Sequence, residues 1–382
     1  MISWSVWLIP ISFAAGNVFK ISLFSPQIRI SILDIAVILL IILGLPELLR
    51  KKKQALQSFK VWLKPLVIFL IFSLLTLVVS GKEFGLEAQL VGLSYWIRFL
   101  AYSILPLFLF NLFSTVQMKR MLISCGFLIV LGGLLQYFLL PDTRFIKFYG
   151  WDDHYYRVLG QFLDPGFAGL MFVLSLVYLA VNPLRNPQFN FLLWSASYLG
   201  LALTYSRSSF LAFLFSIAAI SYYLRSLAVI VLSLLLIAGT VYHLPRASDG
   251  EGVKLERTGS ITARADSWNT GWSIFIHRPL FGVGFNTYRF AQNQAGYLTG
   301  VNWQTTHSGS APDASLLFVA ATTGILGFLL YLWYLSGMFS LFSPVINTSL
   351  VGIIVHSFFL NSLFYPFVLV WLALLTALKP NS

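Results

Sequence analysis

The chain has 382 residues, of which 58% are hydrophobic and only 10% are charged. Because soluble proteins carry about a quarter charged residues, this composition excludes an ordinary soluble globular protein. The formal net charge is +12, but the basic residues are spread between apolar runs, which argues against a nucleic-acid-binding protein. The one cysteine, Cys125, lies inside an apolar run and is expected to be a small buried core residue.

Apolar runs of nearly 20 residues recur along the whole chain. Runs of this length cross about 30 Å of hydrocarbon as helices, and they are continuous rather than alternating, so helices are favoured over a membrane β-barrel. We therefore predict an all-α polytopic membrane protein with a single integral membrane domain over residues 1–382. The twelve predicted spans lie near residues 2–16, 30–49, 62–80, 91–112, 120–140, 165–181, 189–205, 209–224, 227–243, 313–340, 345–363 and 366–378.

Basic residues in short loops predict the orientation of the spans. The loop after the second span holds Arg50, Lys51, Lys52, Lys53, Lys60 and Lys64, and loops of this kind are retained in the cytoplasm. Alternation from this loop places both termini in the cytoplasm, with the first run interpreted as a membrane helix rather than a cleaved signal peptide. Two outer segments result, a smaller loop over 141–164 and a large loop over 244–312 before the tenth span.

The large outer loop contains one segment with helical periodicity. From Ile261 to His277, the aromatic residues Trp268, Trp272 and Phe275 recur on one face. This spacing predicts an amphipathic helix that lies on or near the outer membrane surface. Pro279 and the glycines that follow it are expected to end the helix in a turn.

Three arginines fall at the outer face in this topology: Arg157, Arg207 and Arg264. A guanidinium group stays charged and offers a fixed fork of donors that suits phosphate oxygens, so the three side chains are candidates to converge on a diphosphate. The alternative is that they anchor helix ends or contact lipid headgroups. Arg207 lies in a tight turn between two apolar runs, where an unpaired charge is costly, and this favours a bound anion.

His307 and Asp313 lie just before the tenth span and are the candidates for a general base. Histidine has a near-neutral pKa, and an aspartate serves if its pKa is raised. The alternative for His307 is a solvated loop residue. The alternative for Asp313 is the N-cap of the following helix, a role that aspartate fills well and that does not exclude catalysis.

Two charges fall within predicted spans, Asp34 and Arg98. Isolated charges inside a membrane are rare, so we predict that these two form a pair. The sequence has no phosphate-binding glycine loop, no HExxH motif and no cysteine cluster, so neither a nucleotide cofactor nor a metal site is expected. The run 152–154, Asp-Asp-His, is more often solvated than metal-bound.

Four patterns in the second half of the chain carry a family resemblance. They are the run RVLGQFLDPGFAG from Arg157 to Gly169, the turn Ser206-Arg207-Ser208, the pattern Arg264-x3-Trp268-x6-Phe275-x3-Pro279-x2-Gly282-x-Gly284, and the pair Gly324-x2-Gly327. With these patterns the chain resembles the bacterial O-antigen ligase and O-antigen polymerase superfamily of polytopic membrane glycosyltransferases. The family often has His-Asn about eleven residues before the first glycine of that pair. Here Asp313 occupies this position and His307 lies six residues earlier, so both stay candidates for the base.

The resemblance implies a cell-envelope polysaccharide enzyme of the bacterial cytoplasmic membrane. Its donor would be a glycan linked to undecaprenyl diphosphate, with the diphosphate held by Arg207 and Arg264 and with Arg157 as a third candidate. His307 or Asp313 would activate the hydroxyl of a glycan, lipid or protein acceptor, without a metal or a nucleotide sugar. The aromatic face of Trp268, Trp272 and Phe275 is suited either to a sugar or lipid, or to membrane anchoring. Ligases and polymerases share these patterns.

A polytopic transporter or flippase for a lipid-linked glycan is the alternative function, because twelve spans is a common number for transporters. Transporters with alternating access usually place their binding groups near the membrane midplane, often on broken helices in paired halves. The candidate charges in this chain lie towards the outer side instead, which favours catalysis at that face.

Overall fold

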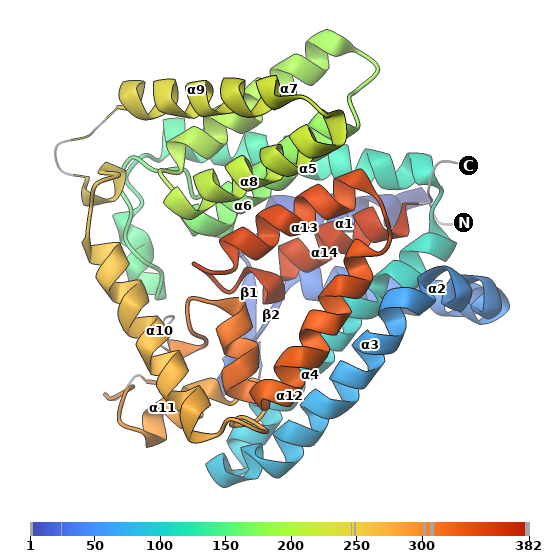
Figure 1. Ribbon diagram of the computed structural model, residues 1–382, viewed down its shortest axis with the longest axis vertical. Helices are drawn as coiled ribbons and strands as arrows, with labels where there is room; N and C mark the ends of the chain where they lie inside the picture. The colour runs from blue at the N-terminus through green and yellow to red at the C-terminus, as the bar shows by residue number, and fades with distance from the viewer. Residues whose placement is uncertain are drawn as a thin grey trace.

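The computed structural model describes residues 3–23, 25–245, 247, 250–300, 303–305 and 309–378, and most of them are helical (Figure 1). The α-helices are α1 Leu8–Ala15, α2 Ile32–Arg50, α3 Lys52–Val79, α4 Gly85–Leu112, α5 Thr115–Leu139, α6 Pro165–Val181, α7 Pro187–Leu203, α8 Arg207–Leu224, α9 Leu227–His243, α10 Gly259–His277, α11 Tyr288–Gln294, α12 Ser315–Phe339, α13 Pro344–His356 and α14 Pro366–Ala377. Short 3-10 helices include η1 Ser3–Trp7, η2 Gly81–Phe84, η3 Arg144–Tyr149, η4 Gly160–Phe162, η5 Glu251–Val253 and η7 Ser362–Phe364. Strands β1 Lys20–Leu23 and β2 Ser25–Ser31 pair antiparallel.

Each of the twelve predicted spans overlaps one of these α-helices, which confirms the nearly all-α class. Among the described residues, six helical segments are long and apolar enough to cross a membrane: Ile32–Arg50, Gln57–Val79, Gly81–Leu112, Thr115–Leu139, Arg207–Leu224 and Ser315–Phe339. The apolar helices α1, α6, α9, α13 and α14 are shorter, with at most 17 residues. The total of twelve crossings and their sidedness therefore stay predictions.

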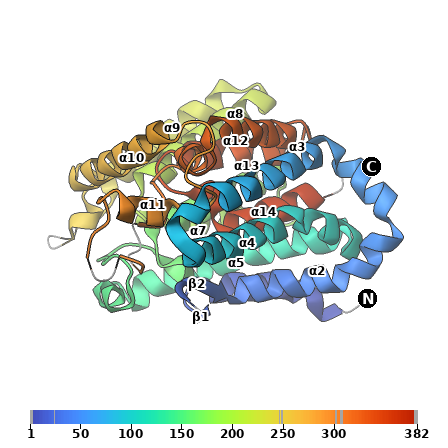
Figure 2. The same ribbon diagram turned by 90° about the horizontal axis from the view of Figure 1, so that it is seen from below.

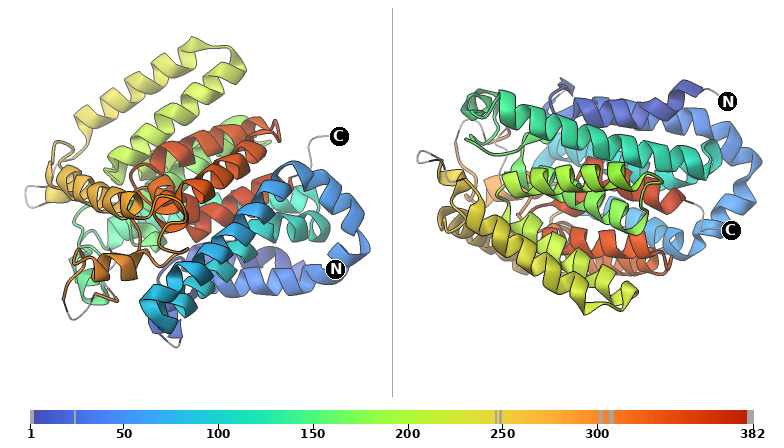
Figure 3. Two further views of the ribbon diagram at one scale, coloured as in Figure 1. Left: turned by 60° about the horizontal axis from the view of Figure 1, so that its bottom comes forward. Right: turned by 90° about the horizontal axis from the view of Figure 1, so that it is seen from above.

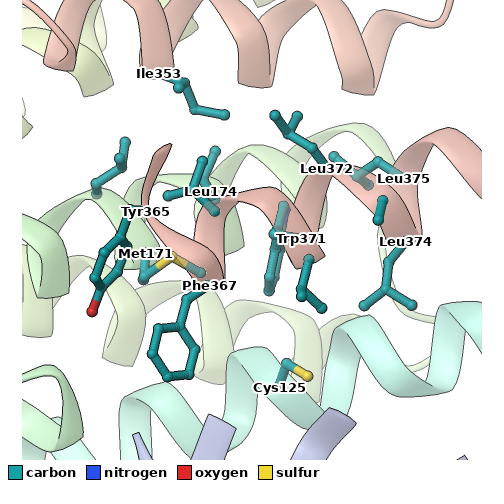
Figure 4. Packing of buried hydrophobic residues seen from close by; sticks show 14 of the residues in the cluster. Cys125, Met171, Leu174, Ile353, Tyr365, Phe367, Trp371, Leu372, Leu374 and Leu375 are labelled. Atoms are coloured by element: carbon teal, nitrogen blue, oxygen red, sulfur yellow. The ribbon is translucent and has the colours of Figure 1, made fainter. Parts of the chain in front are cut away.

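Helix α6 is the centre of the bundle. Nearly every side chain from Pro165 to Leu179 is buried, and the helix packs against α5, α7, α8 and α13. A helix that is apolar on all sides is expected in such a position. Figure 4 shows how Met171 and Leu174 of α6 lie beside Phe367 and Trp371 of α14, with the buried thiol of Cys125 on α5 nearby.

The elements outside the long helices gather at one end of the molecule. Helices α10 and α11 lie at the end of the molecule that is opposite to η1 and to the C-terminal end of α14 (Figures 2 and 3). The smaller predicted outer loop, 141–164, contains η3 and η4 and an isolated bridge between Asp142 and Tyr155. The larger one, 244–312, contains η5, α10 and α11. This is the end of the bundle at which the candidate site residues lie.

A break in α12 fixes the position of α10. At Gly324 the helix has φ 69° and ψ −174°, and the loop after α10 fits into the gap. The N–H of Ile325 donates to the carbonyl of Pro279 at 2.7 Å. A Cβ at Gly324 would lie 2.1 Å from the carbonyl oxygen of Leu280, so only glycine permits this approach. The glycine pair near the start of α12 and the proline–glycine turn after α10 thus form one structural unit.

The predicted pair of intramembrane charges is confirmed. Arg98 on α4 places Nε 2.8 Å from Oδ1 of Asp34 on α2. Asp34 also accepts hydrogen bonds from the backbone N–H of Ser31, at 2.8 Å, and from the hydroxyl of Tyr102, at 3.0 Å. The Arg98 guanidinium lies over the ring of Tyr95, 4.9 Å from its centroid. Every charge of this couple is therefore satisfied by protein groups, as burial in a membrane requires.

Candidate functional site

Arg157 enters the site from the loop before α6. Its side chain is only 6% exposed, and its Nε donates to the carbonyl of Thr204 at 2.9 Å. Burial, followed by the charges of Arg257 and Arg264, lowers the pKa of Arg157 to about 9. The guanidinium therefore stays largely protonated at neutral pH, as a buried cation held close to other cations.

Arg207 is the first residue of α8, in a helix start that the side chain of Ser206 caps. Its Nη1 donates to the carbonyls of Leu255 and Arg257, at 3.2 and 3.1 Å, and its Nη2 donates to Oγ of Ser260 at 2.6 Å. The predicted tight turn before α8 is present. The three hydrogen bonds hold the segment that leads into α10, so Arg207 joins the bundle to the large outer loop.

Arg264 lies on α10 and differs from the other two arginines in its contacts. Its guanidinium is 5.6 Å from the ring centroid of Phe359, and it makes no hydrogen bond to any residue that the structure describes. Burial is the main cause that lowers its pKa, with the charge of Asp313 opposing and the charge of Arg207 adding to the effect. A partly buried fork of unused donors is the arrangement expected of a group that receives an anion.

The electrostatic effects show that the predicted arginines share one region. The charge of Arg264 acts on Arg157, and the charge of Arg207 acts on Arg264. Arg257, which the sequence analysis missed, is a fourth cation of this group. It donates to the carbonyls of Gly252, at 2.7 Å, and of Tyr205, at 3.3 Å. The polar linker around Arg257 has no sequence pattern that indicates a functional residue, because the role of Arg257 depends on contacts with distant segments.

Asp313 lies beside α10, just before α12. Its backbone N–H donates to Oγ of Ser267 at 2.9 Å, and its carbonyl accepts from Nε1 of Trp268 at 3.3 Å. The carboxylate makes no hydrogen bond within the described ranges. Burial raises the pKa of Asp313 to about 6, against the opposing charge of Arg264, and the charges of Asp164 and Asp152 raise it further.

The prediction that Asp313 caps the helix is wrong. Helix α12 begins at Ser315, and the N-cap position is Ala314, which makes no side-chain cap. The backbone of Asp313 is held by α10 instead, and this contact sets its position. The second candidate base, His307, lies outside the described residues.

A buried histidine supports the Arg207 turn from within the bundle. His356 at the end of α13 is fully buried, and its Nε2 lies 3.3 Å from Oγ of Ser208 and of Ser209. Its Nδ1 lies 2.6 Å from Oγ of Ser362. His356 is distant from Ser208 in the sequence and lies in an apolar run, so no local pattern pointed to it. We interpret this cluster as a positioning element for the start of α8.

The helix predicted from Ile261 to His277 is confirmed as α10, and its position at a membrane surface stays a prediction. Its apolar residues divide between two sides. Gly271 and Ile274 are buried, and α10 packs against α12. Trp268 and Trp272 are 40% and 57% exposed, so they remain available to a membrane or a substrate. The rings of Trp272 and Phe275 contact each other with centroids 5.4 Å apart.

The run 152–154 is not arranged as a metal site. Asp153 pairs with Lys147, with Nζ to Oδ2 at 3.5 Å. Burial lowers the pKa of His154 to about 3, with the charge of Arg157 adding to the effect. Among the described residues, no group of three or more histidine, cysteine, aspartate or glutamate side chains is placed to hold a metal ion.

A comparison with protein-family models identifies part of the chain. Residues 190–332 match the family model described as O-antigen ligase, which supports the resemblance to the O-antigen ligase superfamily that the sequence predicts. The matched segment includes Arg207, Arg264 and Asp313, whereas Arg157 lies before it. No curated protein matches the chain.

Proposed function

From the O-antigen ligase family that residues 190–332 match, we propose that the protein is an inner-membrane glycosyltransferase. It transfers glycan from an undecaprenyl-diphosphate-linked donor to an acceptor hydroxyl at the outer face of the cytoplasmic membrane. The family supports the class of reaction, and the apolar helices support the membrane location. The identity of the donor lipid and the roles of single residues are our proposal.

One observation carries the proposal. Arg264 offers a partly buried guanidinium, and Asp313 offers a partly buried carboxylate, and neither side chain is hydrogen-bonded to a described residue. The charge of each affects the pKa of the other. A cation and a base that are held near each other, but not closed into an ion pair, suit a reaction that needs both at one reacting centre.

The proposed reaction uses these groups in one displacement. Ionised Asp313 takes the proton of the acceptor hydroxyl, and the oxygen attacks the anomeric carbon of the donor sugar. The bond from this carbon to the diphosphate oxygen breaks, and the electron pair leaves with the lipid diphosphate. Arg264 and Arg157 stabilise the charge that grows on this leaving group. Because the donor carries its own leaving group, the proposal includes no nucleotide sugar and no metal.

Arg207 has a double role in this proposal. Its hydrogen bonds to the segment before α10 set the position of Arg264, and its charge adds to the field at the diphosphate. Lysine offers a point charge instead of a planar fork and is not expected to reproduce three bonds in these directions. We therefore expect Arg207→Ala to abolish transfer at normal membrane levels, and Arg207→Lys to rescue it poorly.

The decisive experiment is reconstitution of the purified protein in vesicles with a radiolabelled undecaprenyl-diphosphate-linked glycan and an acceptor. A new glycosylated product, with release of undecaprenyl diphosphate, supports the proposal. Movement of the labelled glycan across the bilayer without a product would identify a flippase and overturn it. An enzyme that tolerates both Arg207→Ala and Arg264→Ala would end the assignment of the diphosphate site.

A deletion strain then separates ligase from polymerase. Loss of a ligase leaves long, unattached lipid-linked chains, whereas loss of a polymerase leaves short lipid-linked units. The measurement is the length distribution of lipid-linked glycan, compared with a strain that carries the gene on a plasmid.

A further inference from the structure

A cavity of about 280 Å³ lies apart from the arginine group. Its walls come from the β1–β2 hairpin, α4, the start of α11 and the segment around η7. None of Arg157, Arg207, Arg264 and Asp313 lines it. Ala311 and Phe167 do line it, and they are two and three residues along the chain from Asp313 and Asp164, so the cavity neighbours the proposed reaction site.

The charge of this cavity is strongly positive. Lys20, Arg29, Arg98 and Arg289 line it, and Asp34 is the acidic residue among its lining residues. Asp34 is already neutralised by its ion pair with Arg98, and within the described part of the chain neither Lys20 nor Arg29 forms an ion pair. A concave surface lined by one sign of charge focuses its field on the space inside and attracts an anion.

Lys20 shows the strength of this field. Its Nζ lies 5.1 Å from the ring centroid of Trp151 and forms no ion pair within the described part of the chain. Although its side chain is accessible to solvent, protein surrounds it on most sides. Burial, followed by the charges of Arg98 and Arg29, lowers the pKa of Lys20 to about 8. A bound anion would relieve this repulsion.

The rest of the wall combines unpaired amide groups with aromatic rings. Gln27 is nine-tenths buried, and its Nε2 has no hydrogen-bond partner among the described residues; the same holds for the buried Oδ1 of Asn361. Both residues line the cavity together with Tyr95 and Trp151. Buried amide atoms are expected to find partners, and amides beside aromatic rings suit a molecule with hydroxyl groups on an otherwise apolar ring face.

We propose that this cavity binds an acidic sugar residue of the glycan substrate, one that carries a carboxylate. Lys20 and Arg29 hold the carboxylate, the amides of Gln27 and Asn361 meet the hydroxyl groups, and Tyr95 and Trp151 cover the ring. The volume is near the lower end of small-molecule sites, which span about 300–1,000 Å³, so the cavity takes one sugar residue rather than a lipid. This inference rests on the proposed function, because it makes the ligand a part of the transferred or accepting glycan.

The test measures binding directly and needs no transfer. The full-length protein in nanodiscs is titrated with methyl glucuronide, with the neutral methyl glucoside and with inorganic diphosphate, and dissociation constants are measured by calorimetry. We expect the glucuronide to bind at least about tenfold tighter than the glucoside, and to weaken as salt is raised, because the contact is ionic. Equal binding of the two sugars would overturn the proposal.

The double variant Lys20→Gln/Arg29→Gln should lose this preference for the glucuronide. Lys82→Gln/Arg185→Gln is the matched control, since it removes the same charge at two exposed positions that do not line the cavity, and it should bind as the wild type does. Equal thermal midpoints of the two variants show that folding is intact. Unchanged glucuronide binding by the cavity variant overturns the proposal. Direct binding of inorganic diphosphate that the cavity variant loses and the control variant keeps also overturns the proposal, because the cavity would then be the diphosphate site.

The two proposals fail in different ways. If the protein prefers the glucuronide but transfers no glycan in the vesicle assay, the glycosyltransferase proposal is wrong and the proposed binding site is retained. Transfer that persists with no selectivity between the two sugars would remove the cavity proposal alone.

Discussion

Two arginine–aspartate couples lie in different regions of this molecule and differ in their contacts. Arg98 and Asp34 form a closed ion pair with Nε to Oδ1 at 2.8 Å, and Asp34 is bonded to Ser31 and Tyr102 as well. Arg264 and Asp313 influence each other's pKa values, yet neither side chain forms a hydrogen bond with a described residue. The same two residue types thus form a closed ion pair in one region, whereas in the other their charged groups stay unbonded.

The difference follows from the location of each couple. Asp34 and Arg98 belong to two long apolar helices, α2 and α4, where an unpaired charge is costly. Arg264 and Asp313 lie on α10 and in the loop before α12, and the backbone of Asp313 rather than its carboxylate is held by α10. A satisfied charge stabilises the fold, whereas an unsatisfied one stays available for a ligand or a proton. Substitutions in the two couples test whether this difference in contacts causes a difference in function.

The largest effect is expected for Asp313→Asn. The amide cannot take a proton from the acceptor, and loss of a general base typically costs about 10²–10⁴ in rate. The initial rate of glycan transfer in vesicles measures this loss, and the amount of folded protein in the membrane should not change. A variant that keeps more than about half of the wild-type rate would shift the role of base to His307.

Arg264→Ala should reduce transfer by about 10²–10³, the usual cost of removing one group that stabilises a developing negative charge. Lysine at this position should rescue poorly if the contact is bidentate. The matched control is Arg278→Ala, at the end of the same helix. Arg278 already pairs with exposed Glu83 at 2.8 Å, so its loss should leave transfer unchanged and cost at most about 1 kcal/mol of stability.

The closed couple should respond in stability rather than in chemistry. Arg98→Ala leaves Asp34 buried without its cation and should lower the free energy of unfolding by about 3–5 kcal/mol, whereas Arg264→Ala should leave stability nearly unchanged. Thermal midpoints in detergent compare the two variants. The exchange Asp34→Arg with Arg98→Asp should rescue either single change only in part, because an arginine cannot accept the bonds from Ser31 and Tyr102. Equal midpoints for Arg98→Ala and Arg264→Ala would contradict the contrast.

The smallest effect is a displacement of the pH profile. The ionised form of Asp313 is the active base, so kcat/KM should be constant well above pH 6 and fall about tenfold per unit below it, since the pKa of Asp313 is about 6. Arg264→Gln removes a cation that favours the ionised carboxylate, so the same limb should move to higher pH. An acidic limb that persists in Asp313→Asn would assign it to another group.

Several features of the site could be predicted from the sequence because their causes are local. The run Ser206-Arg207-Ser208 indicates a turn between two apolar segments, and the periodicity of Trp268 and Trp272 predicts α10. Pro279 and the glycines after it mark the turn that the structure shows. The N-cap prediction for Asp313 failed because contacts from α10 overrode a local preference.

The apolar runs are sufficient to predict a helical membrane protein, because lipid requires backbone groups to hydrogen-bond within their own segment. The cost of a lone charge in such a run also determined that Asp34 would find Arg98. Packing between remote segments holds Arg207 in hydrogen bonds but leaves Arg264 without one among the described residues. It also brings His356 to Ser208 although 148 residues separate them, and it places cations from several segments around one cavity. These outcomes depend on distances between remote segments, and such distances are set by packing rather than by local pattern.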